Sequence, residues 1–335
     1  MKSIVLFMAY YGKLPNYFDI WLQAAENNST INFCLITDLI GDECQLPKNV
    51  KLLNLTYDEF KKSIQKAFPF NVSINSLGRI SQFRPAFAYI FPKEVEGYDF
   101  WGFIECDLIP GNIRKFITDD VLRHNQKVFK LGHLQLFENN KFMNTLFMQR
   151  SLSALSYKFA FKNDILFFEE LLGMHNLACA KKISTYTDNV FSDVLCYEYM
   201  FSTSTYGYPE IASKKCLFEY NKGNLYRYSE ENNKLIKEET LYVHLQKRQM
   251  TLETNDLNSY LIIPNSFIKH ISIDKKYFDT VVKNSKLLET DYARVMKDKF
   301  EKDRVKRNKK LCWWILRAIR LRIKLFGGVD LNGNK

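Results

Sequence analysis

The sequence lacks paired cysteines, a long hydrophobic run and a glycine-rich phosphate loop. Its seven cysteines are odd in number, scattered and never spaced as Cys-x-x-Cys, which argues against a disulfide framework or a thiolate zinc site. No run approaches the roughly 18 apolar residues of a membrane-spanning helix, and no cleavage site follows the apolar N-terminus. We therefore expect a cytoplasmic protein that does not span a bilayer. The missing phosphate loop argues against a nucleotidyltransferase.

Positive charge is concentrated at the end of the chain, although the whole sequence has a net charge of +11. From Ile273 onward, 18 Lys and Arg oppose 8 Asp and Glu, whereas the residues before it carry 30 against 29. A nearly neutral body without a basic, aromatic-interleaved motif argues against a nucleic-acid partner. We divide the chain into a folded domain, residues 1–272, and a basic tail, residues 273–335.

The pattern of apolar residues predicts an α/β fold. Short apolar runs that end in polar or turn residues are typical of buried strands, and they occupy residues 4–11, 32–37, 50–55, 98–104 and 127–137. Helical patterns occupy residues 16–28, 57–68, 163–172 and 275–300, and a further helix begins at Arg84-Pro85. The initial order of strand, helix, strand, strand and helix fits an α/β nucleotide-binding half. The pattern of residues 215–245 predicts Tyr-rich hairpin strands.

The strongest candidate site is Glu105-Cys106-Asp107, which follows the predicted strand of residues 98–104. Ligands of open α/β sheets bind beyond the carboxyl ends of the strands, so both carboxylates can reach one hard cation there. Taken alone, such a pair is more often a solvated surface pair. The buried strand before it and the Pro110-Gly111-Asn112 turn after it favour a rigid site. Glu105 and Asp107 are thus candidate ligands of Mn²⁺ or Mg²⁺.

His244 is the best candidate for a third metal ligand among the five histidines. It ends a predicted strand and is followed by Lys247 and Arg248, which could pair with phosphate oxygens. An imidazole ligand suits Mn²⁺ better than Mg²⁺. The ordinary alternatives are a hydrogen-bonded histidine and two solvated cations.

Six segments occur in order through about three quarters of the chain: AYYGKLPNYF (9–18), LITD (35–38), FRPAFAYIF (83–91), GYDFWGFIECDLIPGNIRKFIT (97–118), GHLQLFENN (132–140) and HLQKR (244–248). Together they resemble a bacterial family of polysaccharide-biosynthesis glycosyltransferases, related to GT-A enzymes with an Asp-x-Asp metal motif. The resemblance implies a Rossmann-like GT-A catalytic domain over residues 1–272. It also implies a nucleoside-diphosphate sugar donor, with UDP favoured and GDP as the alternative, and it leans towards retention of the anomeric configuration.

The resemblance implies roles for individual residues on the donor side. Tyr10, Tyr11 and Asp38 would frame the nucleotide, and the Asp-x-Asp position falls on Glu105 and Asp107, with Asp107 as a catalytic residue. Glu105 departs from the usual aspartate, and its longer reach leaves its role open. The ordinary alternatives for the first three residues are packing aromatics and a helix or turn cap.

Two more groups follow from the same resemblance. Related enzymes carry a basic and an acidic residue before the motif strand, where this chain has Arg79, Gln82 and Arg84. Arg79 could contact a phosphate or the donor sugar, or it could be a surface residue like Arg84. The acceptor-side candidates are Glu169 and Glu170, as base or hydroxyl contact, with Gly132-His133, Asp188 and Asp193 as further candidates. Two glutamates in a helix are also commonly solvated.

These residues predict a metal-dependent hexosyltransferase of surface polysaccharide synthesis, either capsule or lipopolysaccharide. Its acceptor would be a glycan or a lipid-linked glycan. The alternative is a non-catalytic sugar-nucleotide-binding or glycan-binding protein of the same fold, which the departure at Glu105 keeps open.

The basic tail predicts a peripheral location on the inner face of the cytoplasmic membrane. Arg317, Arg320 and Lys324 share one helical face, apolar residues occupy most of the rest, and Trp313 and Trp314 lie at the start. This pattern fits a helix that lies in an anionic membrane interface. The alternative is a helix that packs on the domain or on a second subunit.

Overall fold

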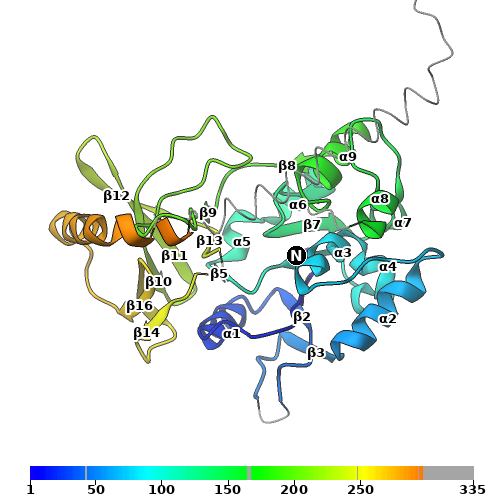
Figure 1. Cartoon of the computed structure of the whole chain (residues 1–335), viewed down its shortest axis with the longest axis horizontal. Coiled ribbons are helices and arrows are strands. Elements are labelled where there is room, and N and C mark those ends of the chain that lie inside the picture. The colour runs from blue at the N-terminus through cyan, green and yellow to red at the C-terminus, as the bar shows by residue number, and fades with distance from the viewer. Residues whose placement is uncertain (42–43, 164–166, 247, 293, 297–335) are drawn as a thin grey trace, which may run out of the picture.

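The structure, a computed structural model, describes residues 1–41, 44–163, 167–246, 248–292 and 294–296. Its strands form a seven-stranded sheet, a six-stranded sheet and a three-stranded sheet that lies between the other two (Figure 1). Short helices cover the seven-stranded sheet. The predicted α/β class is confirmed.

The seven-stranded sheet has the order β3-β2-β1-β4-β7-β6-β8. Its strands are β1 (Ile4–Ala9), β2 (Asn32–Thr37), β3 (Val50–Asn54), β4 (Phe100–Ile104), β6 (Lys127–Val128), β7 (Leu134–Glu138) and β8 (Thr185–Tyr186). β1 pairs in parallel with both β2 and β4. The carboxyl ends of these three strands therefore meet at one edge, and Tyr10, Asp38 and Glu105 follow them there.

Both faces of this sheet are buried, because successive side chains of a strand point to opposite faces. Leu6 of β1 lies in one buried cluster with Trp21 of α1 (Phe18–Asn27), and Phe7 lies in the other with Phe60 of α2 (Tyr57–Ala67). Shorter helices complete the two layers: α3 (Ile80–Phe83), α4 (Phe87–Ile90), α5 (Ile113–Phe116), α6 (Asp119–His124), α7 (Lys141–Asn144), α8 (Tyr157–Lys162) and α9 (Asn176–Ala180).

The six-stranded sheet packs on α1 and on a C-terminal helix. Its strands are β10 (Cys216–Asn221), β11 (Asn224–Glu231), β12 (Lys234–Glu239), β14 (Thr251–Glu253), β15 (Ser259–Ile263) and β16 (Ser266–Lys269). Ile20 of α1 lies in a cluster with Phe218, whereas Phe278 of the helix over residues 275–292 lies in another with Leu217. The predicted hairpin strands and the described part of the predicted C-terminal helix are confirmed.

The three-stranded sheet has the order β5-β13-β9, with β5 (Leu108–Pro110), β13 (Tyr242–His244) and β9 (Ser192–Asp193). β5 begins directly after Asp107. This sheet therefore connects the acidic pair at the edge of the large sheet with residues far along the chain.

Two expected elements were wrong. The strand expected at residues 127–137 is interrupted, because Phe129 has a φ of 63° and the chain turns before β7 begins. The α-helix expected at residues 163–172 is not formed in its described part, residues 163 and 167–172, where the chain turns and then enters the π-helical segment Leu171–His175. There Gln82 accepts a hydrogen bond from the main chain of Phe168, so a tertiary contact overrides the local helical preference.

No helix within the described ranges is long and apolar enough to cross a membrane. Residues 302–326, which carry the expected membrane helix, lie outside these ranges. The boundary at residue 272 and the role of the tail stay predictions.

Candidate functional site

The candidate site is assembled at the carboxyl end of β4. Glu105 and Asp107 lie in the connection from β4 to β5, and β5 pairs with β13 so that Leu108 lies opposite His244. β13 also pairs in parallel with β9, which places His244 opposite Asp193. Three segments far apart in the sequence thus bring three carboxylates and an imidazole towards one point.

His244 contacts all the carboxylates of this group. Its Nε2 lies 3.3 Å from Oε2 of Glu105 and 3.6 Å from Oδ2 of Asp107, and its Nδ1 lies 2.8 Å from Oδ1 of Asp193. Asp107 and His244 are buried, whereas the side chain of Glu105 is 20% exposed. The group is therefore enclosed on the protein side and open at Glu105.

The three residues Glu105, Asp107 and His244 fit a divalent metal ion. Their ligand atoms lie within 4.8 Å of one another. Adjacent ligands of an ion with bonds of about 2.1–2.2 Å lie about 3 Å apart, close to the two distances from His244 Nε2. Two carboxylates with one imidazole form a donor set that suits Mn²⁺ and also accepts Mg²⁺.

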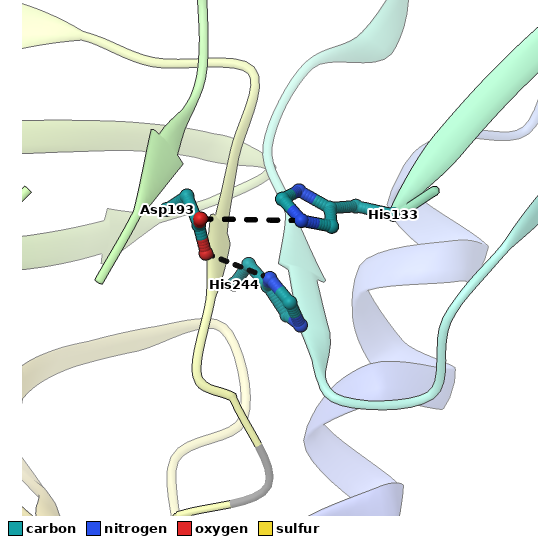
Figure 2. A group of neighbouring side chains, drawn as sticks. All are labelled: His133, Asp193 and His244. Carbon is teal, nitrogen blue, oxygen red and sulfur yellow. Dashed lines mark hydrogen bonds and ion pairs between the residues drawn. The ribbon is translucent and has the colours of Figure 1, made fainter. Parts of the chain in front are cut away.

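A second set of ligand atoms shares His244, namely His133, Asp193 and His244 (Figure 2). Asp193 bonds to Nδ1 of His244 and lies 3.9 Å from Nε2 of His133. Gln246, whose φ is 54°, donates to the same oxygen of Asp193 at 2.6 Å. Because Asp193 already binds Nδ1, it orients the imidazole and leaves Nε2 for the Glu105 and Asp107 side, as supporting carboxylates do for metal-binding histidines.

The electrostatics of the group favour a cation at His244. Burial alone would lower the pKa of His244, but the charge of Asp107 and hydrogen bonds to Asp107, Asp193 and Glu105 raise that pKa well above its usual value. The same carboxylates that stabilise a proton on the imidazole would stabilise a metal ion in its place, so metal binding would release this proton.

Glu105 remains ionised although it is largely enclosed. Burial opposes its charge, but Arg84 and His244 hold the pKa of Glu105 well below its usual value. Arg84 Nη1 donates to Oε1 of Glu105 at 2.6 Å and to the main-chain oxygen of Gly132 at 3.1 Å. Arg84 therefore lies at the site and is not a solvated surface residue.

His133 is neutral at physiological pH. Burial and the neighbouring charge of His244 lower the pKa of His133 to about 4. The two rings lie 4.1 Å apart between centroids, and Tyr242 Oη lies 3.4 Å from Nδ1 of His133. A neutral imidazole at this position can accept or donate a hydrogen bond without adding charge.

Glu169 and Glu170 approach the site through Gly132. A Cβ on Gly132 would lie 2.9 Å from Oε1 of Glu170 and 3.1 Å from Cγ of Glu169, so these side chains pack directly on the glycine. Glu169 accepts a hydrogen bond from Gln82, and burial raises its pKa. Burial, followed by the charges of Glu169 and Glu105, raises the pKa of Glu170 to about 8.

The residues expected around the nucleotide lie at the adjacent strand ends. Tyr10 donates to the main-chain oxygen of Lys13, and its pKa is raised to about 12 by burial and by the charges of Cys106 and Asp107. Tyr11 packs against Tyr57 at 5.2 Å between ring centroids. Asp38 is exposed directly after β2. This side of the site is formed by the large sheet.

Two arginines expected to contact the donor are held by main-chain oxygens. Arg79, only 2% exposed, donates to Ser73 and Ala160. Arg248 donates to Leu195, Glu198 and Tyr199. The structure thus gives both guanidinium groups a role in fixing loops, and Lys247 lies outside the described residues.

The structure changes the rank of the site residues. Sequence reasoning chose Arg79 rather than Arg84 as the donor contact, and it treated Asp193 and His133 only as acceptor-side candidates. Their contacts with Glu105 and His244 depend on pairing between distant strands. Within the sequence around Asp193, its place beside a short apolar segment is the only feature that could have marked it as a site residue.

Comparison with known proteins gives a family and a similar fold. The model of a family of unknown function (DUF6625) matches residues 6–271. No curated protein matches the sequence. The galactosyltransferase LgtC, solved with donor and acceptor sugar analogues, is 9% identical over 57% of this chain and 75% of that chain, with a TM-score of 0.33.

Two further solved structures are similar to the same extent. The glycosyltransferase GlyE of Streptococcus pneumoniae TIGR4 is 12% identical over 56% of this chain and 46% of that chain, with a TM-score of 0.30. Mouse xyloside xylosyltransferase 1 is 11% identical over 58% of this chain and 88% of that chain, with a TM-score of 0.33. All three structures are glycosyltransferases by name, and at these TM-scores the functional assignment depends on the residues of the site.

Proposed function

The chain belongs to this family of unknown function, DUF6625, and we propose that it is a metal-dependent glycosyltransferase. It would transfer a hexose from a nucleoside-diphosphate sugar to a glycan or lipid-linked glycan of a surface polysaccharide. The observation that carries the proposal is the convergence of Glu105, Asp107 and His244 at the carboxyl end of β4, with His244 oriented by Asp193. The six motif segments of the sequence add to this support.

Glu105, Asp107 and His244 would hold the metal ion, Mn²⁺ in preference to Mg²⁺. When bound, the ion stabilises the negative charge that develops on the leaving diphosphate. Arg84 keeps Glu105 ionised and adds positive charge beside the diphosphate position. Tyr10, Tyr11 and Asp38 at the neighbouring strand ends would bind the nucleoside, with UDP favoured over GDP.

Glu169 and Glu170 would act on the acceptor side. A carboxylate with a raised pKa is a stronger base than an ordinary one, and Glu170, with a pKa of about 8, can accept a proton from an acceptor hydroxyl. Glu169, held by Gln82, would position this acceptor hydroxyl. Arg79 and Arg248 support the surrounding loops in this scheme.

A thermal-shift screen of UDP- and GDP-sugars, with and without Mn²⁺, tests the proposal. We expect at least one sugar nucleotide to raise the melting temperature by about 5 °C at roughly 100 times its Kd, only when Mn²⁺ is present. Asp107→Asn removes a metal ligand of nearly the same shape and should abolish this shift. Slow release of UDP or GDP from the stabilising donor would then report transfer to water.

Asp120→Asn, at an exposed position of α6, is the matched control and should keep the full shift. Stabilisation that needs no metal and survives Asp107→Asn would contradict the proposed site. Metal-dependent stabilisation without nucleotide release, even with acceptor glycans, would instead indicate a non-catalytic sugar-nucleotide-binding protein.

A further inference from the structure

A cavity of about 70 Å³ lies beside the metal-ligand group. Asp193, which bonds to His244, lines one side, and Tyr206, whose hydroxyl donates to Glu170 at 3.1 Å, lines another. The cavity thus touches residues that contact both the candidate metal ligand and the candidate base. Its volume corresponds to about five water molecules, the space of one sugar ring rather than of a nucleotide.

Three polar atoms on the cavity-lining residues are buried and unpaired. Among the described residues, Oδ1 of Asn189, the hydroxyl of Tyr208 and Nε of Arg227 have no hydrogen-bond partner. Tyr208 is only 4% exposed. An unpaired buried polar atom costs free energy, so such atoms call for a ligand or another explanation. They comprise an acceptor, a group that both donates and accepts, and a donor, which together match sugar hydroxyl groups once side-chain rotations turn them towards the cavity.

Three aromatic rings, together with Ile211 and Ala212, supply the apolar part of the cavity wall. Phe191 packs edge-on against Tyr208 at 5.8 Å between centroids, and Tyr206 and Tyr208 flank Gly207. Gly207 has a φ of +79°, and a Cβ there would lie 2.9 Å from Leu131, so this tight turn holds both tyrosines in place. Aromatic surface combined with a few polar groups is typical of small-molecule sites.

None of the described residues that line the cavity carries an unpaired charge that would select an anion. Arg227 forms an ion pair with Glu238 at 2.9 Å, and Lys214 lies 3.8 Å from Glu231. Asp193 is bonded to His244 and Gln246. An uncharged, hydroxyl-rich ring fits this balance better than a phosphate or a carboxylate.

The position of the cavity distinguishes it from the nucleotide side. Asp193 lies on β9, the strand of the small sheet farthest from β5, whereas Tyr10 and Asp38 follow β1 and β2 of the large sheet. A donor bound at these strand ends would therefore reach the metal ligands from the large sheet, whereas the cavity lies beside β9.

We propose that this cavity is the acceptor subsite and binds one uncharged pyranose ring, whose hydroxyls pair with Asn189, Tyr208 and Arg227. The inference rests on the proposed function, because it assigns the ring to the acceptor of that reaction. Tyr206 links the bound ring to Glu170.

Saturation-transfer NMR with methyl glycosides of galactose, glucose, N-acetylglucosamine and mannose tests the inference on the full chain without metal or donor. We expect transfer to the ring protons of at least one glycoside. Tyr208→Phe removes only a hydroxyl and Asn189→Ala only an amide, and each should weaken binding by about three- to tenfold, the effect of one hydrogen bond. Tyr260→Phe removes another buried, unpaired hydroxyl, in β15, and should change nothing.

The same variants separate this inference from the proposed function. Absence of transfer to every glycoside, or equal binding by Tyr208→Phe, Asn189→Ala and the unaltered chain, would overturn the subsite. Metal-dependent donor stabilisation that persists in that case would leave the proposed function in place. Glycoside binding that depends on Tyr208 in a chain that binds no sugar nucleotide would keep the cavity as a sugar site and reject its role as an acceptor subsite.

Discussion

At the scale of single residues, the site departs from an Asp-x-Asp pair at Glu105, which stands at the position of the first aspartate. One of its oxygens accepts a hydrogen bond from Arg84 at 2.6 Å, and the other lies 3.3 Å from Nε2 of His244. Arg84 also binds the main-chain oxygen of Gly132, against which Glu169 and Glu170 pack. Glu105 thus keeps one oxygen on the metal side, while its other oxygen is linked through Arg84 and Gly132 to Glu169 and Glu170.

Glu170 should make the stability of the protein depend on pH. Its pKa is about 8 in the folded chain, against a usual 4.5, because of burial and then the charges of Glu169 and Glu105. Between these values the folded state binds more protons than the unfolded state, so the free energy of unfolding falls as pH rises, by at most about 1.4 kcal/mol per pH unit. Glu170→Gln keeps an oxygen that accepts the hydrogen bond from Tyr206, but it removes the titrating carboxyl and with it the fall in the free energy of unfolding. Thermal melts from pH 5 to 9 should therefore show the variant gaining stability over the unaltered chain as pH rises.

Glu210→Gln, at an exposed position, is the matched control for that series. Its melting curve should run parallel to that of the unaltered chain across the whole range. A parallel curve for Glu170→Gln as well would show that Glu170 titrates like an ordinary carboxyl.

At the scale of elements, the sequence predicts those parts of the fold that are decided by local burial. The runs at residues 4–11, 32–37 and 50–55 became β1, β2 and β3 within two residues, because each is a short apolar run; β1 and β2 are almost fully buried, and β3 is partly exposed. Two segments were predicted wrongly. The left-handed conformation of Phe129 interrupts the first, and a hydrogen bond from the main chain of Phe168 to the Gln82 side chain redirects the second.

The candidate site shows the same division. Glu105 and Asp107 follow from a strand end, but the contact of His244 with them requires β13 to pair with β5. Asp193 reaches His244 through a further pairing between residues about fifty positions apart. No periodicity within one segment encodes such pairing, which explains why the supporting carboxylate was not ranked first.

Gly102 of β4 should be essential for the strand that carries the acidic pair. A Cβ at this position would lie 2.0 Å from the main-chain oxygen of Gln135 in β7. Gly102→Ala should therefore push β4 and β7 apart and lower the free energy of unfolding by about 1–3 kcal/mol. Urea denaturation measures this loss, and metal-dependent donor binding should weaken with it.

Gly78→Ala is the matched control, because a Cβ there would meet nothing within 4 Å and its φ is not left-handed. Its stability should change by no more than about 0.5 kcal/mol. Equal stability of the two variants would mean that β4 and β7 tolerate a wider separation than the structure shows.

At the scale of the whole molecule, the site joins two bodies of secondary structure. The large sheet supplies the acidic pair and the expected nucleotide side, while the strands around β9 and β13 supply the histidine, its supporting carboxylate and the cavity (Figure 1). α1 packs against both larger sheets through different faces, with Trp21 on one and Ile20 on the other. This shared helix fixes the two halves of the site relative to each other.

The uneven distribution of charge leads to a prediction for the whole chain. Eighteen of its Lys and Arg follow residue 272, so an anionic membrane should attract the tail and leave the nearly neutral body facing the cytoplasm. We expect the full chain to float with liposomes that contain anionic lipid, and to lose this binding at high salt or when residues 302–326 are deleted. Replacing Arg317, Arg320 and Lys324 by Gln should weaken partitioning roughly 100-fold, at about 1 kcal/mol per cation.

A control that removes equal charge from the body decides whether position or net charge matters. Lys62, Lys66 and Lys93 are exposed on the folded domain, and their replacement by Gln lowers the net charge by the same three units. This variant should float like the unaltered chain, because its charges lie outside the apolar helical pattern that enters the interface. If both triple variants float equally, or if deletion of residues 302–326 has no effect, the tail does not anchor the protein and its helix must instead pack on the domain or on a second subunit.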